Sequence, residues 1–218
     1  MTILDSVLAS SSAPTMFDAS NSPVGNICAH LNAFHVYASD PSRTVETNHY
    51  CSHLTPKVRQ CILYDGPGPK ARLIGVEYMV TSDIFETLPA DEKKLWHSHV
   101  FEVKSGMLVM PQPDNSYIPM GAWDAVETKE MEAVVTLYGK VYHLWQTDRG
   151  DELPLGQPQL MTSLTEASQM KDFEKTIDAR DEKLNGVEWR KKRDLRKDIP
   201  EMKVDEHADW TWKKGNSS

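Results

Sequence analysis

Histidine and carboxylate residues gather in three short segments in the middle of the chain, and their side chains are suited to binding a metal ion. They are His49 and His53, then His97, His99 and Glu102, and finally His143. Neutral imidazole is a common metal ligand near neutral pH, and a carboxylate supplies negative charge that histidines lack. Two or three imidazoles with a carboxylate are typical of catalytic zinc and non-haem iron sites. The sequence therefore predicts a divalent Fe or Zn ion bound by a subset of these six residues.

The spacing of the first pair favours a shared face. His49 and His53 are four residues apart, which places both on one face in a helix and also in a strand. The helical HExxH arrangement of zinc proteases uses this spacing, but the intervening Tyr50-Cys51-Ser52 contains no glutamate. A metalloprotease is therefore not favoured.

The second cluster depends more strongly on its backbone conformation. In a strand, His97 and His99 point the same way and Glu102 points opposite, whereas in a helix His99 and Glu102 share a face. Pro89 and the acidic residues after it favour a helix start, and Gly106 marks its end. We therefore expect His99 to pair with Glu102, and His97 to join them only where the helix kinks or ends.

Glu77 interrupts an apolar strand and is a further candidate. Ile74, Val76, Tyr78 and Val80 alternate with it and share the opposite face. Glu77 either faces solvent, or is buried with a raised pKa and serves as an acid, a base or an extra ligand. Together with Glu102 it is the predicted catalytic carboxylate.

Each histidine also has a structural interpretation. A lone histidine such as His143 is more often a hydrogen-bonded core or surface residue than a ligand. We interpret His30, His35 and His207, which lie outside the three segments, as structural or solvated.

The local patterns predict a mixed α+β fold in one compact domain, with a small, mostly antiparallel sheet flanked by helices. Strands are expected at residues 60–64 and 72–81 around a Gly/Pro turn, and at 107–110 and 140–147. Helices are expected at residues 26–37, 43–54, 90–105 and 124–137.

The two ends of the chain differ from its middle in composition and in predicted structure. Residues 1–25 predict an irregular arm with a short helix near residues 3–8, and residues 26–165 form the predicted domain. Residues 166–218 predict a charged helical extension, in which Met170, Phe173 and Ile177 recur at helical spacing and could dock on the body. Gly186 is expected to interrupt it. Six of the eight residues 190–197 are basic, and we interpret them as a solvated helix end in preference to a lipid-binding or nuclear-targeting segment.

Composition narrows the functional classes. The net charge of −8 disfavours nucleic-acid binding, and no apolar run approaches the roughly 20 residues that span a bilayer. Cys28, Cys51 and Cys61 form no CxxC pair, which favours reduced thiols in the cytoplasm. The first basic residue is Arg43, so an export signal is not expected.

Five blocks of sequence resemble the oil body-associated protein family of seed plants, which has fungal and bacterial relatives. The blocks are HYCSHL at 49–54, RQCILYD at 59–65, ARLIGVEYMV at 71–80, LPADEKKLWHSHVFEVKSGMLV at 88–109 and YGKVYHLWQTDRGDELPLGQPQLM at 138–161. The resemblance implies association with seed oil bodies and an effect on their stability, without an established reaction or agreed catalytic residues. All six candidate ligands lie within these blocks. Where the plant pattern has a histidine, this chain has Gln146.

Two functions follow from these patterns. The first is a mononuclear metal-dependent enzyme acting on a small organic substrate, with a non-haem iron oxidoreductase favoured over a zinc hydrolase or lyase. The alternative is a noncatalytic protein held peripherally on lipid droplets, with its amphipathic or basic C-terminal region as the anchor. The oligomeric state is not indicated by the sequence.

Overall fold

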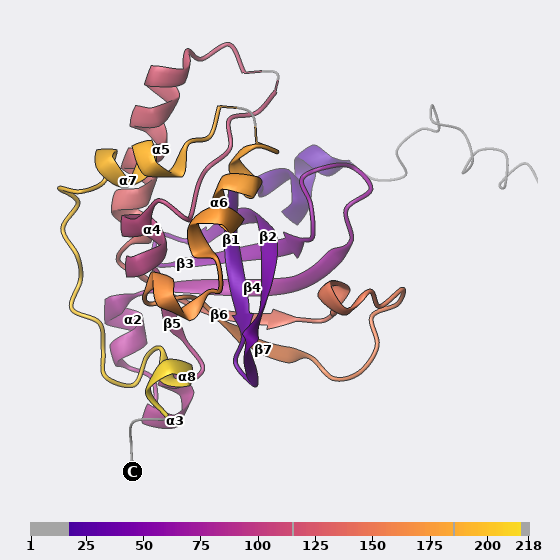
Figure 1. Cartoon of the computed structure of the whole chain (residues 1–218), viewed down its shortest axis with the longest axis vertical. Coiled ribbons are helices and arrows are strands. Elements are labelled where there is room, and N and C mark those ends of the chain that lie inside the picture. The colour runs from indigo at the N-terminus through magenta and orange to yellow at the C-terminus, as the bar shows by residue number, and fades with distance from the viewer. Residues whose placement is uncertain (1–17, 115, 185, 215–218) are drawn as a thin grey trace, which may run out of the picture.

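Seven antiparallel strands form the centre of the computed structural model, which describes residues 18–114, 116–184 and 186–214. The strands are β1 (Ala29–Tyr37), β2 (Asp40–Thr55), β3 (Val58–Tyr64), β4 (Leu73–Thr81), β5 (His97–Ser98), β6 (Leu137–His143) and β7 (Gln159–Thr162). Their order is β4-β3-β2-β1-β7-β6-β5, and β4 also pairs with β6, from Gly75 to Thr81. That pairing closes the sheet on itself (Figure 1). The predicted helix at residues 3–8 lies outside the described residues.

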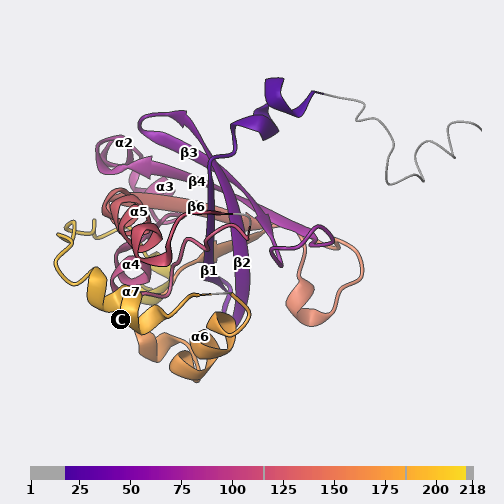
Figure 2. The same ribbon diagram turned by 90° about the horizontal axis from the view of Figure 1, so that it is seen from above.

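Helices flank the sheet and confirm the predicted α+β class. The α-helices are α2 (Ser82–Glu86), α3 (Ala90–Lys93), α4 (Val100–Ser105), α5 (Met120–Val134), α6 (Phe173–Asp181), α7 (Trp189–Leu195) and α8 (Trp210–Lys213). The described residues also form short 3-10 turns: η1 (Ala19–Asn21), η2 (Pro23–Asn26), η3 (Thr147–Arg149) and η4 (Ala167–Gln169). Helices α4, α5 and α7 pack together beside the sheet, and the segment joining β6 to β7 projects on the opposite side (Figures 1 and 2). In the described part of the chain, no helix has the length and apolar character needed to cross a membrane.

The first two predicted helices are wrong, because residues 26–37 and 43–54 lie mainly in strands β1 and β2. Seven consecutive residues of β1, from Leu31 onward, are buried. A strand covered on both faces shows a continuous apolar run instead of alternation, and such a run cannot be distinguished from a buried helix by its pattern. In β2 the β-branched residues Thr44, Val45 and Thr47 suit an extended backbone.

The hairpin of β3 and β4 is confirmed, and the predictions for the following segments need partial correction. The predicted helix at residues 90–105 is divided into α3 and α4 by the short strand β5, although Gly106 does end α4 with a φ of 81°. Residues 107–110 form no strand and contribute one isolated bridge, between Val109 and Asn32. Helix α5 begins at Met120, earlier than predicted, and β6 begins at Leu137.

Cys51 and Cys61 form a disulfide, so the prediction of three reduced thiols is wrong for these two residues. They lie directly opposite each other on β2 and β3, in a register that the sequence spacing alone does not reveal. Cys28 is free and exposed.

The apolar stripe of the C-terminal extension docks on the body, as predicted. Met170, Phe173 and Ile177 are buried with Phe34 and Val36 of β1 in one hydrophobic cluster. The basic segment that follows is not simply a solvated helix end, because Lys192 and Arg196 are buried. Gly186, with a φ of 73°, lies between α6 and α7, so the helical extension is interrupted there as expected.

Candidate metal centre

Glu77 is the centre of a buried polar cluster inside the closed sheet. On β4 it lies between Cys61 of β3 and Val141 of β6, and it is 1% exposed. The next residue, Tyr78, points outward and is 47% exposed. Of the two orientations that the sequence left open, the structure therefore shows the buried one.

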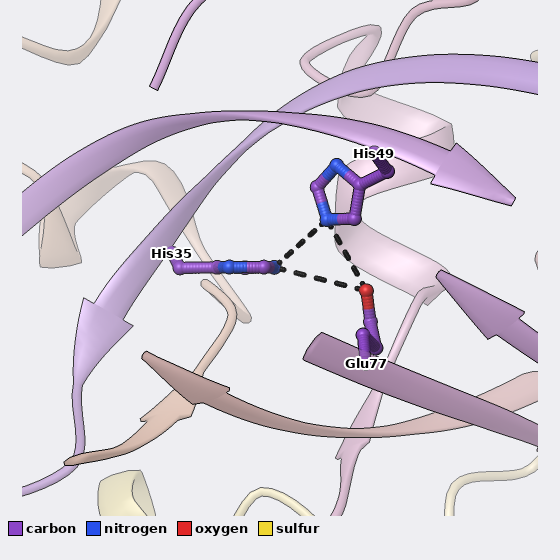
Figure 3. Close-up of side chains that lie close together, drawn as sticks. All are labelled: His35, His49 and Glu77. Atoms are coloured by element: carbon purple, nitrogen blue, oxygen red, sulfur yellow. Dashed lines mark hydrogen bonds and ion pairs between the residues drawn. The ribbon is translucent and has the colours of Figure 1, made fainter. Parts of the chain in front are cut away.

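His35 and His49 approach one oxygen of Glu77 (Figure 3). His49 Nε2, from β2, is 3.2 Å from Glu77 Oε2, and His35 Nε2, from β1, is 4.0 Å from the same oxygen. The two Nε2 atoms form a hydrogen bond of 3.1 Å with each other. His35 Nδ1 in turn forms a hydrogen bond of 3.0 Å with His143 Nε2. Imidazoles of three strands therefore make a continuous chain that ends at the carboxylate.

His97 and His99 approach the other oxygen of Glu77. His97 Nε2, on β5, is 3.3 Å from Glu77 Oε1, and His99 Nε2, at the start of α4, is 3.6 Å from it. Glu102 Oε2 lies 3.8 Å from His99 Nε2. His99 Nδ1 forms a hydrogen bond of 3.0 Å with the carbonyl oxygen of Leu137. The expected pairing of His99 with Glu102 is confirmed, and His97 joins them because the backbone changes from strand to helix between the two histidines.

Burial and the contacts within the cluster shift the pKa values of its carboxylate and histidines. Burial by itself raises the pKa of Glu77, but the nearby rings of His49, His97 and His99 hold that pKa well below its usual range. The predicted raised pKa is therefore wrong. Burial lowers the pKa of His143 to about 3, and burial together with the neighbouring His49 keeps the pKa of His35 well below its usual value. For His99, burial is outweighed by Glu77 and Glu102, and its pKa is about 9.

Several polar atoms of the cluster have no hydrogen-bond partner among the described residues. They include both oxygens of Glu77, Nε2 and Nδ1 of His97, and Oε2 of Glu102. The nearest imidazole nitrogens, those of His49, His97 and His99, lie 3.2, 3.3 and 3.6 Å from the Glu77 oxygens. Unsatisfied buried polar atoms of this kind cost about 1–3 kcal/mol each, and several of them aimed into one space are suited to a cation.

His53 is not part of the cluster, contrary to the prediction. It is exposed near the end of β2, whereas His49 is buried. Four residues along a strand span about 13 Å, so two histidines on one face remain far apart. The same spacing in a helix separates the Cβ atoms by only about 6 Å. A shared face therefore does not imply a shared metal.

His35 is the residue that sequence reasoning missed, because it was interpreted as structural or solvated. Read as a strand, the segment places His35 on one face with Leu31, Ala33 and Tyr37, and this single polar residue in an apolar face is the signal that could have found it. His30 and His207 lie outside the cluster as expected, hydrogen-bonded to Asn48 and Asp205. Gln146 accepts a hydrogen bond from Arg43.

The C-terminal segment supports His97 and His99. Asp209 accepts hydrogen bonds of 2.8 Å from both the backbone N–H and the hydroxyl of Ser98, which stands between His97 and His99. The neighbouring Trp212 donates a hydrogen bond of 2.7 Å to the carbonyl oxygen of Ser163. Strand β5 is thus held by the C-terminal segment as well as by its pairing with β6.

The fold and its interior define an α+β protein with a closed antiparallel sheet and a buried histidine and carboxylate cluster. Residues 21–200 match the family described as "Protein of unknown function (DUF1264)". The chain is 49% identical to oil body-associated protein 1A of Zea mays over 175 residues, which are 80% of this chain and 68% of that relative. It is 47% identical to oil body-associated protein 1B of Arabidopsis thaliana, over 80% of this chain and 67% of the relative. The chain belongs to this oil body-associated protein family. No solved structure matches it.

These relatives overturn the hypothesis of a metal-dependent enzyme. Their names describe an association with oil bodies and no reaction, and this holds for oil body-associated protein 2B of Zea mays as well, at 45% identity over 65% of this chain and 53% of that relative. The roles of Glu77 and Glu102 as catalytic acid or base, and the small-molecule substrate, fall with that hypothesis. What the histidines and carboxylates bind is a separate question.

Proposed function

We propose that this protein is a noncatalytic protein that binds peripherally to the surface of lipid droplets. The observation that carries the proposal is the identity of 45–49% to oil body-associated proteins from two plants. An oil body is a neutral lipid core covered by a phospholipid monolayer, and a protein binds such a surface by placing apolar side chains among the lipids.

The C-terminal stripe is a poor candidate for the contact surface. Phe173 and Ile177 are 8% and 0% exposed, and removing them from the body would open the hydrophobic cluster that they share with β1. Deleting residues 166–218 would also remove buried side chains, and would therefore test folding as much as anchoring.

Exposed leucines in and beside the segment between β6 and β7 are better candidates for the lipid-contact surface. We call Leu73, Leu144, Leu153 and Leu155 the leucine edge; their exposed fractions are 46%, 38%, 62% and 58%. Leu153 and Leu155 belong to the segment between β6 and β7, which projects from the body in both views (Figures 1 and 2). Leu73 begins β4, and Leu144 follows β6 and donates its N–H to the carbonyl oxygen of Ile74.

The projecting segment has internal support, so its leucines are presented by a defined backbone. Trp145 Nε1 donates a hydrogen bond of 2.8 Å to the carbonyl oxygen of Asp151, and the guanidinium of Arg72 lies 5.4 Å from the centre of the Trp145 ring. Fully burying one leucine side chain stabilises binding by about 1.5–3 kcal/mol. Two leucines inserted together would therefore supply enough free energy for reversible attachment.

The test is a double substitution, Leu153→Ser with Leu155→Ser, compared with a matched double substitution, Val126→Ser with Leu195→Ser. The control residues are 48% and 45% exposed and lie on α5 and α7, on the side away from the leucine edge. We expect the first variant to lose about ten-fold or more in binding to droplets, because about 1.4 kcal/mol corresponds to a factor of ten. Flotation with purified droplets measures the bound fraction. Equal binding by the two variants would show that the leucine edge is not the contact surface.

A further inference from the structure

We propose that Glu77, His97, His99 and Glu102 together bind one divalent zinc or iron ion, which serves as a noncatalytic structural cross-link inside the closed sheet. The proposal concerns the interior of the protein and is independent of droplet binding. Imidazole nitrogens and carboxylate oxygens are the usual protein ligands of these ions.

The cluster offers two positions, because Glu77 presents one oxygen to each histidine pair. Three donors lie within 4.8 Å of one another in each case: His35, His49 and Glu77 in the first position, and Glu77, His97 and His99 in the second. Ligands bound at about 2.0–2.2 Å in a tetrahedral arrangement stand roughly 3.3–3.6 Å apart. In the second position Glu77 Oε1 lies 3.3 and 3.6 Å from the two Nε2 atoms, which is within this range. Glu102 Oε2 lies 3.8 Å from His99 Nε2, slightly beyond it.

Hydrogen bonding distinguishes the two positions. In the first, His35 and His49 already satisfy each other through their Nε2 atoms. In the second, His97 Nε2, Glu77 Oε1 and Glu102 Oε2 all lack hydrogen-bond partners among the described residues. A cation in the second position would satisfy three buried atoms that have no other partner, whereas a cation in the first would displace an existing hydrogen bond.

The net charge of each site also favours the second position. A divalent ion in the first position would face one carboxylate, which leaves a net positive charge in an interior where Glu77, His35 and His49 are at most 2% exposed. In the second position Glu102, 2% exposed, adds a second carboxylate and makes the site neutral. Isolated buried charges are strongly unfavourable, so the neutral arrangement is preferred.

Neighbouring groups fix the orientation of these ligands. The hydrogen bond between His99 Nδ1 and the Leu137 carbonyl oxygen leaves Nε2 free to face Glu77, which is the usual way in which a second nitrogen orients a metal-binding histidine. Asp209 holds Ser98 between the two histidines. The imidazole chain of His143, His35 and His49 ends at the other oxygen of Glu77 and supports that carboxylate.

The ion would join segments that the sequence separates. Glu77 belongs to β4, His97 to β5, and His99 and Glu102 to the start of α4. Because the unfolded chain cannot present these ligands together, the free energy of metal binding adds to the stability of the folded state. We therefore expect removal of the metal to lower the unfolding temperature without removing a reaction.

The test is the metal content of the untagged chain, measured by elemental analysis after purification without chelators. We expect one zinc or iron ion per chain in the wild type and in His49→Ala, and its loss in His97→Ala and in Glu102→Gln. The matched control is His53→Ala, on the same strand as His49 but exposed, which should retain the ion. Thermal unfolding checks that each variant is folded.

A second measurement keeps the proposal testable if a variant does not fold. Wild-type protein stripped of metal should unfold at a temperature several degrees higher after addition of Zn²⁺ or Fe²⁺ alone, and added Co²⁺ should give the visible absorption of a four-coordinate ion. A wild type that contains no metal and gains no stability from these ions would overturn the proposal. So would two ions per chain, or one ion that is lost in His49→Ala and kept in His97→Ala.

Discussion

The two oxygens of Glu77 have different surroundings, and this difference organises the interior of the protein. Oε2 meets imidazoles that are hydrogen-bonded to each other, while Oε1 meets His97 and His99, whose Nε2 atoms point at the same space. The close approach of His97 to Glu77 Oε1 depends on Gly139 of β6, which pairs with His97 of β5 in the sheet register. A Cβ atom at position 139 would lie 2.3 Å from Glu77 Oε1 and 2.8 Å from His97 Nε2.

Gly139→Ala should therefore disturb the cluster. In an open strand this change would stabilise the protein slightly by restricting the unfolded chain, but here the added methyl group overlaps two buried side chains. We expect a loss of about 1–3 kcal/mol in the free energy of unfolding, measured by urea denaturation. Gly121→Ala is the control, because no atom other than those of its chain neighbours and its own helix backbone lies within 4 Å of the added Cβ. Equal stability of the two variants would contradict this close packing.

The candidate site was only partly predictable from the sequence. His49, His97, His99, Glu102 and His143 were identified by residue type and do converge in the structure, although metal binding by them stays a prediction. His53 is included because its spacing from His49 gives a shared face in a helix or a strand, although a strand holds the two side chains far apart. His35 is omitted because it lies outside the three histidine segments. Glu77 could not be placed, since the strand pattern shows which residues share a face but not which face is covered.

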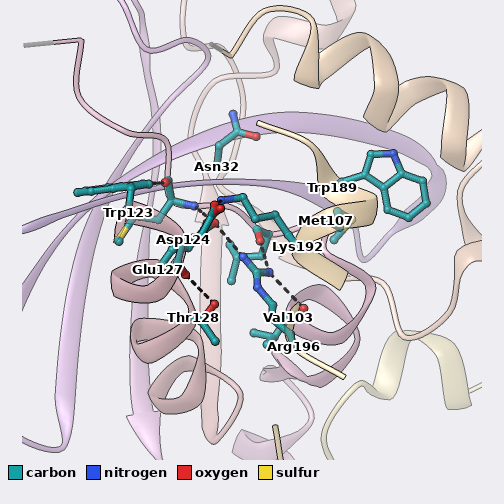
Figure 4. A network of polar contacts seen from close by, with 12 residues as sticks. Asn32, Val103, Met107, Trp123, Asp124, Glu127, Thr128, Trp189, Lys192 and Arg196 are labelled. Atoms are coloured by element: carbon teal, nitrogen blue, oxygen red, sulfur yellow. Dashed lines mark hydrogen bonds and ion pairs between the residues drawn. The ribbon is translucent and has the colours of Figure 1, made fainter. Parts of the chain in front are cut away.

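At the scale of the elements, helix α7 is held against α5 by buried ion pairs (Figure 4). Lys192 Nζ donates to Asp124 Oδ1 at 2.6 Å and also to Glu127. Arg196 donates to Glu127 Oε1 at 2.8 Å and to the carbonyl oxygens of Val103 and Leu108. The basic segment therefore binds acidic and carbonyl groups of its own chain. A run of positive charges does not indicate its partners, which is why the sequence favoured a solvated helix end.

Lys192→Met should be strongly destabilising, because it leaves Asp124 and Glu127 with fewer cationic partners in a buried environment. We expect a loss of about 3 kcal/mol, at the lower end for broken buried pairs because Lys191 and Arg196 remain. Arg190→Met, on the same helix, removes exposed pairs with Glu174 and Asp178 and should cost at most about 1 kcal/mol. Chemical denaturation of both variants measures the difference. Similar losses would mean that burial of Lys192 adds nothing to the stability of the α5–α7 contact.

At the scale of the whole molecule, closure of the sheet separates the two proposed binding sites in space. Glu77 and its histidines are buried at the sheet. The helices α4, α5 and α7 lie on one side, and the segment between β6 and β7, which carries Leu153 and Leu155, projects on the opposite side (Figures 1 and 2). Closure comes from the pairing of β4 with β6, which are more than 50 residues apart in the sequence. Local patterns predicted the α+β class and the β3–β4 hairpin, but they contain no information about this long-range pairing or about the Cys51–Cys61 register.

The most direct test of the proposed function is flotation of the purified wild-type chain with protein-free droplets of triacylglycerol covered by a phospholipid monolayer. The protein is mixed with the droplets, centrifuged below a density step, and measured in the floating layer. Because the leucine edge is exposed without any other protein present, we expect the chain to float with the droplets and to remain below when they are omitted. Wild-type protein that stays below the step in the presence of droplets would contradict the proposal that this chain itself binds the lipid surface.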